Sequence, residues 1–133
     1  MKTAISARNA NCAVLTAMLG AGPICIYNGT QPVSVNAPLA GNDLLVTLTF
    51  ALVPFATPVG GTTIANVIAS GNAVGSGVAT FARFYEVDGV TPVCDVSAGA
   101  PGSGNEMIIS DPTISPGLTV SCSFGSITYP DGA

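Results

Sequence analysis

The sequence predicts a mainly β protein, a β-sandwich or jelly-roll-like fold of seven to eight antiparallel strands with a short N-terminal helix. Turn-forming residues return at short intervals after Gly22, the segments between them alternate apolar and polar side chains, and no helical pattern lies between two strands. Such a pattern is typical of sandwiches and jelly rolls. The length of 133 residues fits a single domain, 1–133, with 1–22 as an N-terminal helical arm.

The N-terminal segment predicts a helix over residues 3–19. Its apolar residues are spaced by three or four positions, the period of one helix face. That face is expected to contain Ala7, Ala10, Cys12, Val14, Leu15 and Met18. Gly20 follows as the expected left-handed residue at the C-terminal end. The segment also resembles a signal peptide, but Asn9 and Asn11 interrupt its apolar stretch. We therefore expect a helix that packs on the body or on a neighbouring molecule.

Extended segments begin at residue 23. Residues 23–27 predict a short strand that ends at Asn28-Gly29, a pair favoured in turns. After an irregular loop with two prolines, residues 44–53 alternate clearly. The expected core face of this strand is Leu44, Val46, Leu48, Phe50 and Leu52. Two further strands, 62–68 and 78–87, flank a glycine-rich link over 71–77, which lacks the lysine and hydroxyl pattern of a phosphate loop.

The second half of the chain predicts three more strands. Asp88-Gly89 marks a tight turn, so residues 91–97 should return antiparallel to the preceding strand. A flexible loop over 98–105 and a short strand over 106–110 lead to residues 118–124, whose alternation is the clearest in the chain. The expected core face there is Leu118, Val120, Cys122 and Phe124. Gly125 then shifts the phase to Ile127 and Tyr129, which indicates a bulge or bend.

The composition argues against most catalytic chemistry. The chain has no histidine, and its three basic residues, Lys2, Arg8 and Arg83, are outnumbered by seven acidic ones. Without histidine there is no imidazole base, no Ser-His-Asp group and no histidine ligand for zinc. We expect no enzyme activity, catalytic residue, cofactor, metal or small-molecule substrate. Three cations also cannot form the basic stripe that nucleic-acid binding requires.

The low charge content points to an assembly. Charged residues make up 8% of the chain, against about 25% in ordinary soluble domains. Hydrophobic residues make up 48%, and the mean hydropathy is +0.59. A membrane would account for this balance, but polar residues, glycine and proline interrupt every stretch before about 18 apolar residues accumulate. We expect an apolar surface that is covered by further copies of the chain, as in a homo-oligomer, or by another protein.

Two local motifs have simple structural interpretations. Asn28-Gly-Thr30 fits the glycosylation sequon, but an Asn-Gly turn explains it as well, so we expect no glycan. Four scattered cysteines could form two disulfides, yet each lies on a predicted apolar stripe or strand, and no Cys-x-x-Cys pair occurs. They are Cys12, Cys25, Cys94 and Cys122. We expect buried free thiols and neither a zinc site nor a redox site.

The charged residues around the 88–89 turn allow two interpretations. Glu86 and Asp88 share a strand face, and Asp95 lies across the turn, so the three would form a weak calcium site if they converged. We favour the other interpretation, solvated acids at strand ends. Arg83 is the sole basic residue of the β region, and we expect it to pair with Glu86, Asp95 or a neighbouring subunit.

Four segments carry a family resemblance. They are Ile5-Ser-Ala-Arg-Asn9, Cys25-Ile-Tyr-Asn-Gly-Thr-Gln-Pro32, Gly77-Val-Ala-Thr-Phe-Ala-Arg-Phe84 and residues 114–129. With these segments the chain resembles small virion structural proteins of tailed bacteriophages. The resemblance implies a cement or decoration protein that stabilises the head by bridging major capsid protein subunits of an HK97-type shell. It implies a location on the capsid exterior after assembly in the host cytoplasm.

Other functions stay open at this point. The chain could be a tail or head-tail connector subunit, or a secreted adhesin or pilus-like module, which would require secretion and oxidised cysteines. Three segments are our candidates for contacts between subunits: 1–22, 30–42 and 98–105. Four cysteines and a longer 54–69 region depart from the usual pattern of the resembled family. The exact position in the particle therefore stays open.

Overall fold

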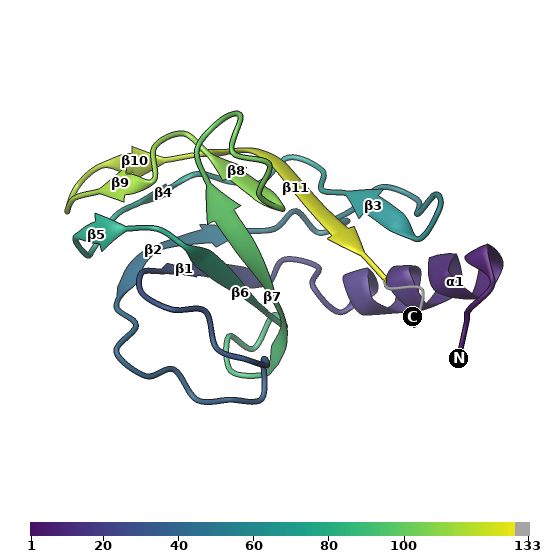
Figure 1. Ribbon diagram of the computed structural model, residues 1–133. Helices are drawn as coiled ribbons and strands as arrows, with labels where there is room; N and C mark the ends of the chain where they lie inside the picture. The colour runs from purple at the N-terminus through teal and green to yellow at the C-terminus, as the bar shows by residue number, and fades with distance from the viewer. Residues whose placement is uncertain (130–133) are drawn as a thin grey trace.

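The computed structural model describes residues 1–129, so the last four residues of the predicted domain lie outside the described part. The described chain is mainly β and contains one helix and eleven strands (Figure 1). Seven strands form one large sheet, which matches the lower number predicted, and four short strands form two separate ribbons. The elements are α1 (Ile5–Ala17), β1 (Pro23–Tyr27), β2 (Leu44–Thr49), β3 (Thr62–Ile64), β4 (Gly71–Asn72), β5 (Gly77–Val78), β6 (Phe81–Tyr85), β7 (Pro92–Gly99), β8 (Met107–Ile109), β9 (Thr113–Ile114), β10 (Thr119–Val120) and β11 (Cys122–Thr128).

The large sheet has the strand order β2-β1-β6-β7-β8-β11-β3. Its long central strand, β7, pairs with β6 along its first part and with β8 at its end, and in Figure 1 it runs from the lower layer to the upper one. The sheet thereby folds over itself around one apolar core, and the predicted sandwich class is confirmed.

The prediction that all strand pairs are antiparallel is wrong for β7 and β8, which pair in parallel through Ala98 and Gly99. The loop between them folds back onto β7. There the amide of Glu106 donates to the Ser97 hydroxyl at 3.0 Å, and the Ser97 amide donates to the Glu106 carboxylate at 3.3 Å. Strand β8 therefore starts beside the end of β7 and runs in the same direction.

Two bulges account for the errors in the predicted core faces. Where β1 pairs with β2, Tyr27 lies opposite Leu44 and Ile26 lies opposite Val46. Leu45 is therefore an extra residue in β2, and it is buried while Leu44 is exposed. Val46, Leu48 and Phe50 are buried as predicted, but Leu52 lies beyond the strand end and is exposed.

The second bulge is in β11, where Ser123 is the extra residue opposite β8. The predicted irregularity near Gly125 is confirmed, but it begins two residues earlier, and Phe124 is exposed rather than in the core. Val120 and Ile127 are buried as predicted. One inserted residue moves every following side chain to the other face, so the alternation alone could not locate the change.

The helix packs on the body through Cys12 and Thr16, and Leu19 just beyond its end is also buried. Four residues predicted for the buried face are exposed instead: Ala7, Ala10, Val14 and Met18. The left-handed residue after the helix is Ala21, with φ 57°, and not Gly20. Glycine is required at position 20 for another reason, because a Cβ atom there would lie 2.6 Å from the carbonyl oxygen of Leu52.

The glycine-rich link predicted over 71–77 contains strand β4 and the start of β5, and it runs along the free edge of β2. The amide of Ala69 donates to the Thr49 carbonyl at 3.0 Å, and that of Val74 donates to the Leu45 carbonyl at 2.8 Å. Between these bonds, Gly71 lies so close to the Thr47 carbonyl that a Cβ atom would clash with it. The absence of side chains lets two backbones approach here, which the prediction of a connector did not include.

The opposite edge of the sheet, strand β3, is covered in a similar way by residues 55–59. The Ala56 amide donates to the Ile64 carbonyl at 2.9 Å, and the Val59 amide donates to the Thr62 carbonyl at 2.8 Å. The buried Thr63 hydroxyl also donates to the Ala56 carbonyl. Both edge strands of the large sheet therefore have neighbours from the same chain.

Candidate interaction surfaces

The three acids considered for a calcium site do not converge. Asp95 is bound to Arg83, and the Asp88 carboxylate accepts hydrogen bonds from the Val90 and Thr91 amides of its own turn. The Thr91 hydroxyl also donates to the Asp88 carboxylate. This bond and the two amide bonds hold the pKa of Asp88 below its usual value. No group of three or more histidine, cysteine or acidic side chains gathers within residues 1–129. The favoured interpretation, solvated acids at strand ends, fits Asp88, which is exposed, but it is wrong for Asp95, which is buried against Arg83.

Arg83 and Asp95 form a buried bidentate ion pair across β6 and β7. The Arg83 Nε atom lies 2.7 Å from Oδ1 of Asp95, and Nη2 lies 2.9 Å from Oδ2. The two side chains are only 5% and 6% exposed. The hydrogen bonds to Asp95 raise the pKa of Arg83. Of the three partners predicted for Arg83, the structure confirms Asp95, in a more deeply buried pair than the surface contact we expected.

The loop over residues 28–43 covers the sheet face on which this ion pair lies. Nη1 of Arg83 donates to the Ala37 carbonyl in the loop at 3.3 Å. On the same face, the rings of Tyr27 and Phe81 stack with centroids 5.4 Å apart, and Phe81 is fully buried although it lies outside the main core. The loop expected to contact other subunits therefore has an inner side that belongs to the fold. Its outer side still presents Val33, which is fully exposed.

Asn42 ties the two ends of this loop together. Its side-chain amide donates to the carbonyl oxygens of Asn28 and Thr30, at 2.8 and 3.0 Å. The Asn28 side chain accepts a 2.7 Å bond from the Asp43 amide, so the asparagine of the sequon is engaged within the fold. Gly29 has φ 78°, as the Asn-Gly turn predicts.

All four cysteines are free thiols, as predicted, but only one of them has the full burial that we expected. Cys12 is fully buried, and the other three are partly buried. Burial raises the pKa of Cys94 to about 12 and raises the pKa values of the other three thiols as well. The neutral thiol is therefore the stable form of each, and thiols in that form are poor nucleophiles.

A thiol assay tests the cysteine assignment. We expect four free thiols per chain when the protein is unfolded without reductant. In the folded state we expect slow reaction of Cys12, which is fully buried, and of Cys94, which is partly buried and has a raised pKa. A disulfide-exchange dye read by absorbance, followed by mass mapping of the labelled peptides, measures both quantities. A reduced sample gives the control count. Two thiols or none in the unreduced sample would contradict the structure and favour the adhesin alternative.

The strand pairing brings together two long segments that contain no charged residue, 44–82 and 112–129. They pair three times, through β3 with β11, β4 with β10 and β5 with β9. We call the surface formed by residues 53–78 and 112–129 the neutral face. Its exposed large apolar side chains are Val53, Val59, Ile64, Val67, Val74, Val78 and Phe124. The segments of this face supply no charge, although Arg8 of α1 lies beside Gly61. A surface with this many exposed apolar groups is typical of one that another protein covers.

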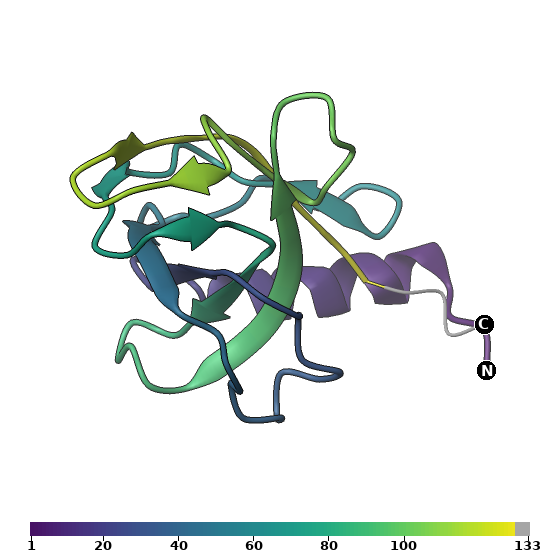
Figure 2. The same cartoon turned by 60° about the vertical axis from the view of Figure 1, so that its left-hand side comes forward.

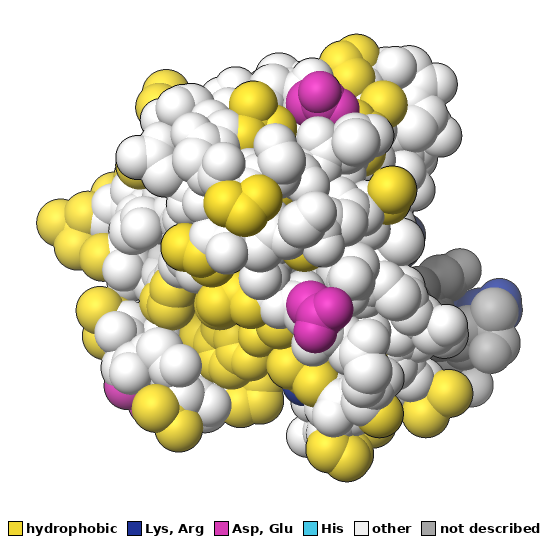
Figure 3. Space-filling view, turned by 90° about the vertical axis from the view of Figure 1, so that its left-hand side faces the viewer, with side chains coloured by type: hydrophobic (Ala, Val, Ile, Leu, Met, Phe, Trp, Pro, Cys, Tyr) yellow, Lys and Arg dark blue, Asp and Glu magenta, His cyan; other side chains and the backbone are white. Residues whose placement is uncertain are grey.

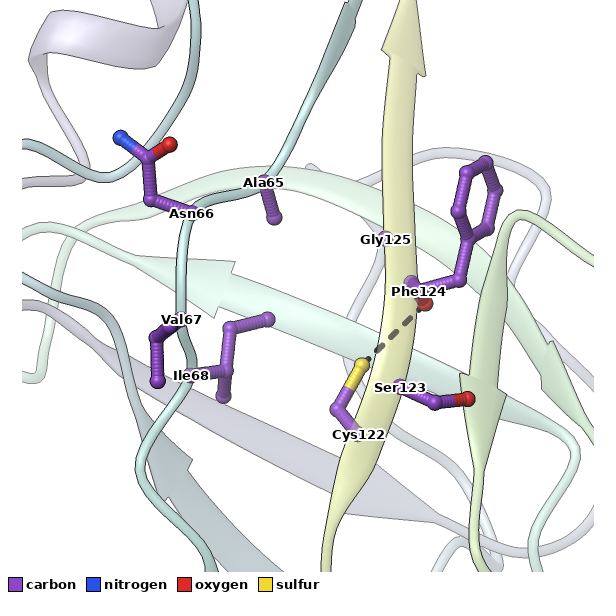
Figure 4. A pocket seen from close by; sticks show the side chains of 8 residues that line it. All are labelled: Ala65, Asn66, Val67, Ile68, Cys122, Ser123, Phe124 and Gly125. Carbon is purple, nitrogen blue, oxygen red and sulfur yellow. Dashed lines mark hydrogen bonds between the residues drawn. The ribbon is translucent and has the colours of Figure 1, made fainter.

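A hollow of about 220 Å³ opens in the neutral face where β3 and β11 separate (Figure 4). Just beyond β3, the Ala65 amide donates to the Gly125 carbonyl of β11 at 2.8 Å. After this bond the chain leaves β11 and turns toward β2. In Figure 4 the Ile68 side chain points across the gap toward β11, whereas the Phe124 ring points away from it. The hollow and the exposed ring lie on opposite sides of the same strand.

The end of the molecule at which β5 lies is apolar as well. Figure 3, which views the molecule from the end where β5 lies, shows hydrophobic side chains in many places and gathered in one hollow, with few acidic groups. No helix within residues 1–129 has the length and hydropathy to cross a bilayer.

No protein-family model, curated protein or solved structure matches the chain.

Proposed function

We propose that the chain is a non-enzymatic structural protein of a phage particle, a cement or decoration protein that binds neighbouring major capsid protein subunits through its neutral face. The observation that carries the proposal is the pairing of the two uncharged segments in three separate places. This pairing brings segments with exposed valines and Phe124 together, next to a large sheet whose own edges are already covered.

A cement protein requires a rigid body and a broad adhesive surface rather than a reaction centre. The buried ion pair of Arg83 and Asp95, the covering loop and the packed helix give this small chain a rigid body. A neutral surface also avoids desolvating charges when it docks. Because many copies bind one particle, modest individual contacts can add up to a large stabilisation of the shell.

The copy number of the chain in purified particles tests this proposal. We expect a ratio to the major shell protein of one to one or a simple fraction of it, measured by quantitative mass spectrometry. A few copies per particle would favour the tail or connector alternative, and absence from particles would refute a virion role. Four free thiols in the thiol assay would argue against an oxidised, secreted adhesin.

A variant pair tests the neutral face itself. Phe124→Asp places a charge among the exposed apolar groups and should reduce occupancy on undecorated particles by about tenfold or more. Val33→Asp is the matched control, since Val33 is fully exposed on the covering loop outside the neutral face. Occupancy is read by sedimentation of particles with added purified protein. Binding by Phe124→Asp as strong as that of the unchanged chain would exclude the neutral face as the contact. Loss of binding by Val33→Asp as well would place the covering loop in the contact.

A further inference from the structure

The covering loop, residues 28–43, is fixed to the fold at its two ends. The Asp43 amide donates to the Asn28 side chain at 2.7 Å, and the Asn42 side chain donates to the Asn28 carbonyl at 2.8 Å. Residues 31–40 lie between these ends, and we call them the lid. Every residue of the lid is exposed or half-buried. Segments with so few buried groups are those that open locally, because little apolar surface is lost from contact when they move.

Among the described residues, one hydrogen bond joins the lid to a strand of the sheet, and it is the longest bond of its donor. Nη1 of Arg83 donates to the Ala37 carbonyl at 3.3 Å, whereas the same guanidinium donates to Asp95 at 2.7 and 2.9 Å. The longer bond is at the outer limit of ordinary N–H···O distances. Opening of the lid would transfer this N–H group to water and leave the buried ion pair in place.

Two glycines with a left-handed backbone flank the lid and are suited to act as pivots. Gly29 has φ 78°, and Gly41 has φ 69°. A Cβ atom at Gly41 would meet nothing within 4 Å, so its backbone conformation, and not a close contact, requires glycine there. Between the pivots, Pro32 and Pro38 restrict the backbone. A stiff segment between two pivots moves as a unit.

The lid gains little from packing on itself. A hollow of about 260 Å³ lies within the covering loop, and all of its walls come from residues of that loop, Pro32, Ala37 and Pro38 among them. Side chains that line a hollow lack contacts on one side and lose the dispersion energy of those contacts. The closed lid is therefore stabilised chiefly by its contact with the sheet.

Two aromatic rings lie on the sheet face that the covering loop covers. Tyr27 and Phe81 pair across β1 and β6, and their rings stack with centroids 5.4 Å apart. They alternate with the core residues Ile26 and Ala82, so they point to the face opposite the core. In Figures 1 and 2 the loop lies on this lower side of the sheet, away from the upper layer. Both rings are buried, and part of that burial comes from the loop.

We propose that the lid swings open about its two glycine pivots while the strands and the buried ion pair stay intact. The open form uncovers the stacked rings of Tyr27 and Phe81, so the closed and open forms differ in the aromatic surface that they expose. This conformational change belongs to the chain alone. It does not rest on the shell partner proposed above, and its tests need no particles.

Hydrogen exchange read by NMR over a series of low urea concentrations tests local opening. The Ala37 amide, bonded to the Ser34 carbonyl, reports the lid, and the Thr80 amide, bonded to the Tyr27 carbonyl, reports the sheet. We expect exchange at Ala37 to be at least about a hundredfold faster than at Thr80 and nearly independent of urea, because local opening exposes little surface. Equal rates with the same urea dependence would overturn the proposal, since the lid would then open only when the sheet unfolds.

A pair of glycine variants tests the pivot. Gly41→Ala strains the closed form, because alanine disfavours a positive φ, and it should raise exchange in the lid by about fivefold or more. Gly102→Ala is the matched control. Gly102 has φ 82° and the same open space around a Cβ atom, but it lies in the loop between β7 and β8. This control variant should leave exchange in the lid unchanged.

Hydroxyl-radical footprinting read by mass spectrometry shows whether the rings become exposed. Oxidation of Tyr27 and Phe81 should rise in Gly41→Ala by a factor similar to that of lid exchange and stay unchanged in Gly102→Ala. The core ring of Phe84 should stay protected in both variants. Circular dichroism confirms that each variant is folded. Equal effects of the two variants on the lid, or no effect of either, would overturn the proposal. Faster lid exchange without added oxidation of the two rings would also overturn it.

Discussion

Replacing Arg83 with alanine should destabilise the fold by about 3–5 kcal/mol, because Asp95 would remain buried without its partner. The substitution also removes the hydrogen bond to the Ala37 carbonyl that holds the covering loop. Urea unfolding monitored by circular dichroism measures the change in the free energy of unfolding.

The double variant R83M/D95L is the control for this prediction. It removes both charges and keeps apolar volume, so it should be much less destabilised than the single variant. A loss below about 1 kcal/mol in Arg83→Ala would show that solvent reaches Asp95 and that the pair contributes as little as a surface ion pair.

Replacing Gly71 with alanine should also have a large effect, a loss of about 2–3 kcal/mol, because the new Cβ atom would clash with the Thr47 carbonyl. The clash would force residues 69–75 away from β2 and break the bond from the Ala69 amide to Thr49. Thermal unfolding reports the loss, and hydrogen exchange at the Ala69 and Val74 amides shows whether it is local to this edge.

Gly125→Ala is the matched control for the Gly71 variant. Its Cβ atom would lie 3.4 Å from that of Ala65, an ordinary contact, and Gly125 does not have a positive φ. Equal destabilisation by the two substitutions would show that glycine is needed in these strands for a reason other than the close approach to β2.

The sequence predicts best the elements that depend on a few neighbouring residues. Strand β1 and the turn at Asp88-Gly89 follow the prediction because short-range backbone preferences determine them. The sequence does not show where the bulges at Leu45 and Ser123 lie, because the position of a bulge depends on the register with a partner strand that is distant in the sequence. The exposed side of α1 was also assigned wrongly, because alanine, valine and methionine fit either face of a helix.

The sequence predicts that the protein has an apolar interaction surface but not where that surface lies in the fold. The low charge content indicates that the isolated chain exposes an apolar surface. The charge-free stretch 44–82 is also visible in the sequence. Its pairing with 112–129 depends on long-range topology, as β11 contacts β3 across more than sixty intervening residues. The partner chosen by Arg83 was one of three predicted alternatives, and the strand register decides among them.

The two covered sheet edges have a consequence for solubility. A chain that is nearly half hydrophobic and carries few charges lacks the electrostatic repulsion that keeps most proteins dispersed. An open strand edge on such a chain would invite cross-β stacking between copies at high local concentration. Residues 55–59 and 69–75 occupy those edges with backbone from the same molecule. The fold can therefore expose apolar side chains for binding while the backbone groups at its sheet edges, which could otherwise start amyloid growth, are already hydrogen-bonded within the same chain.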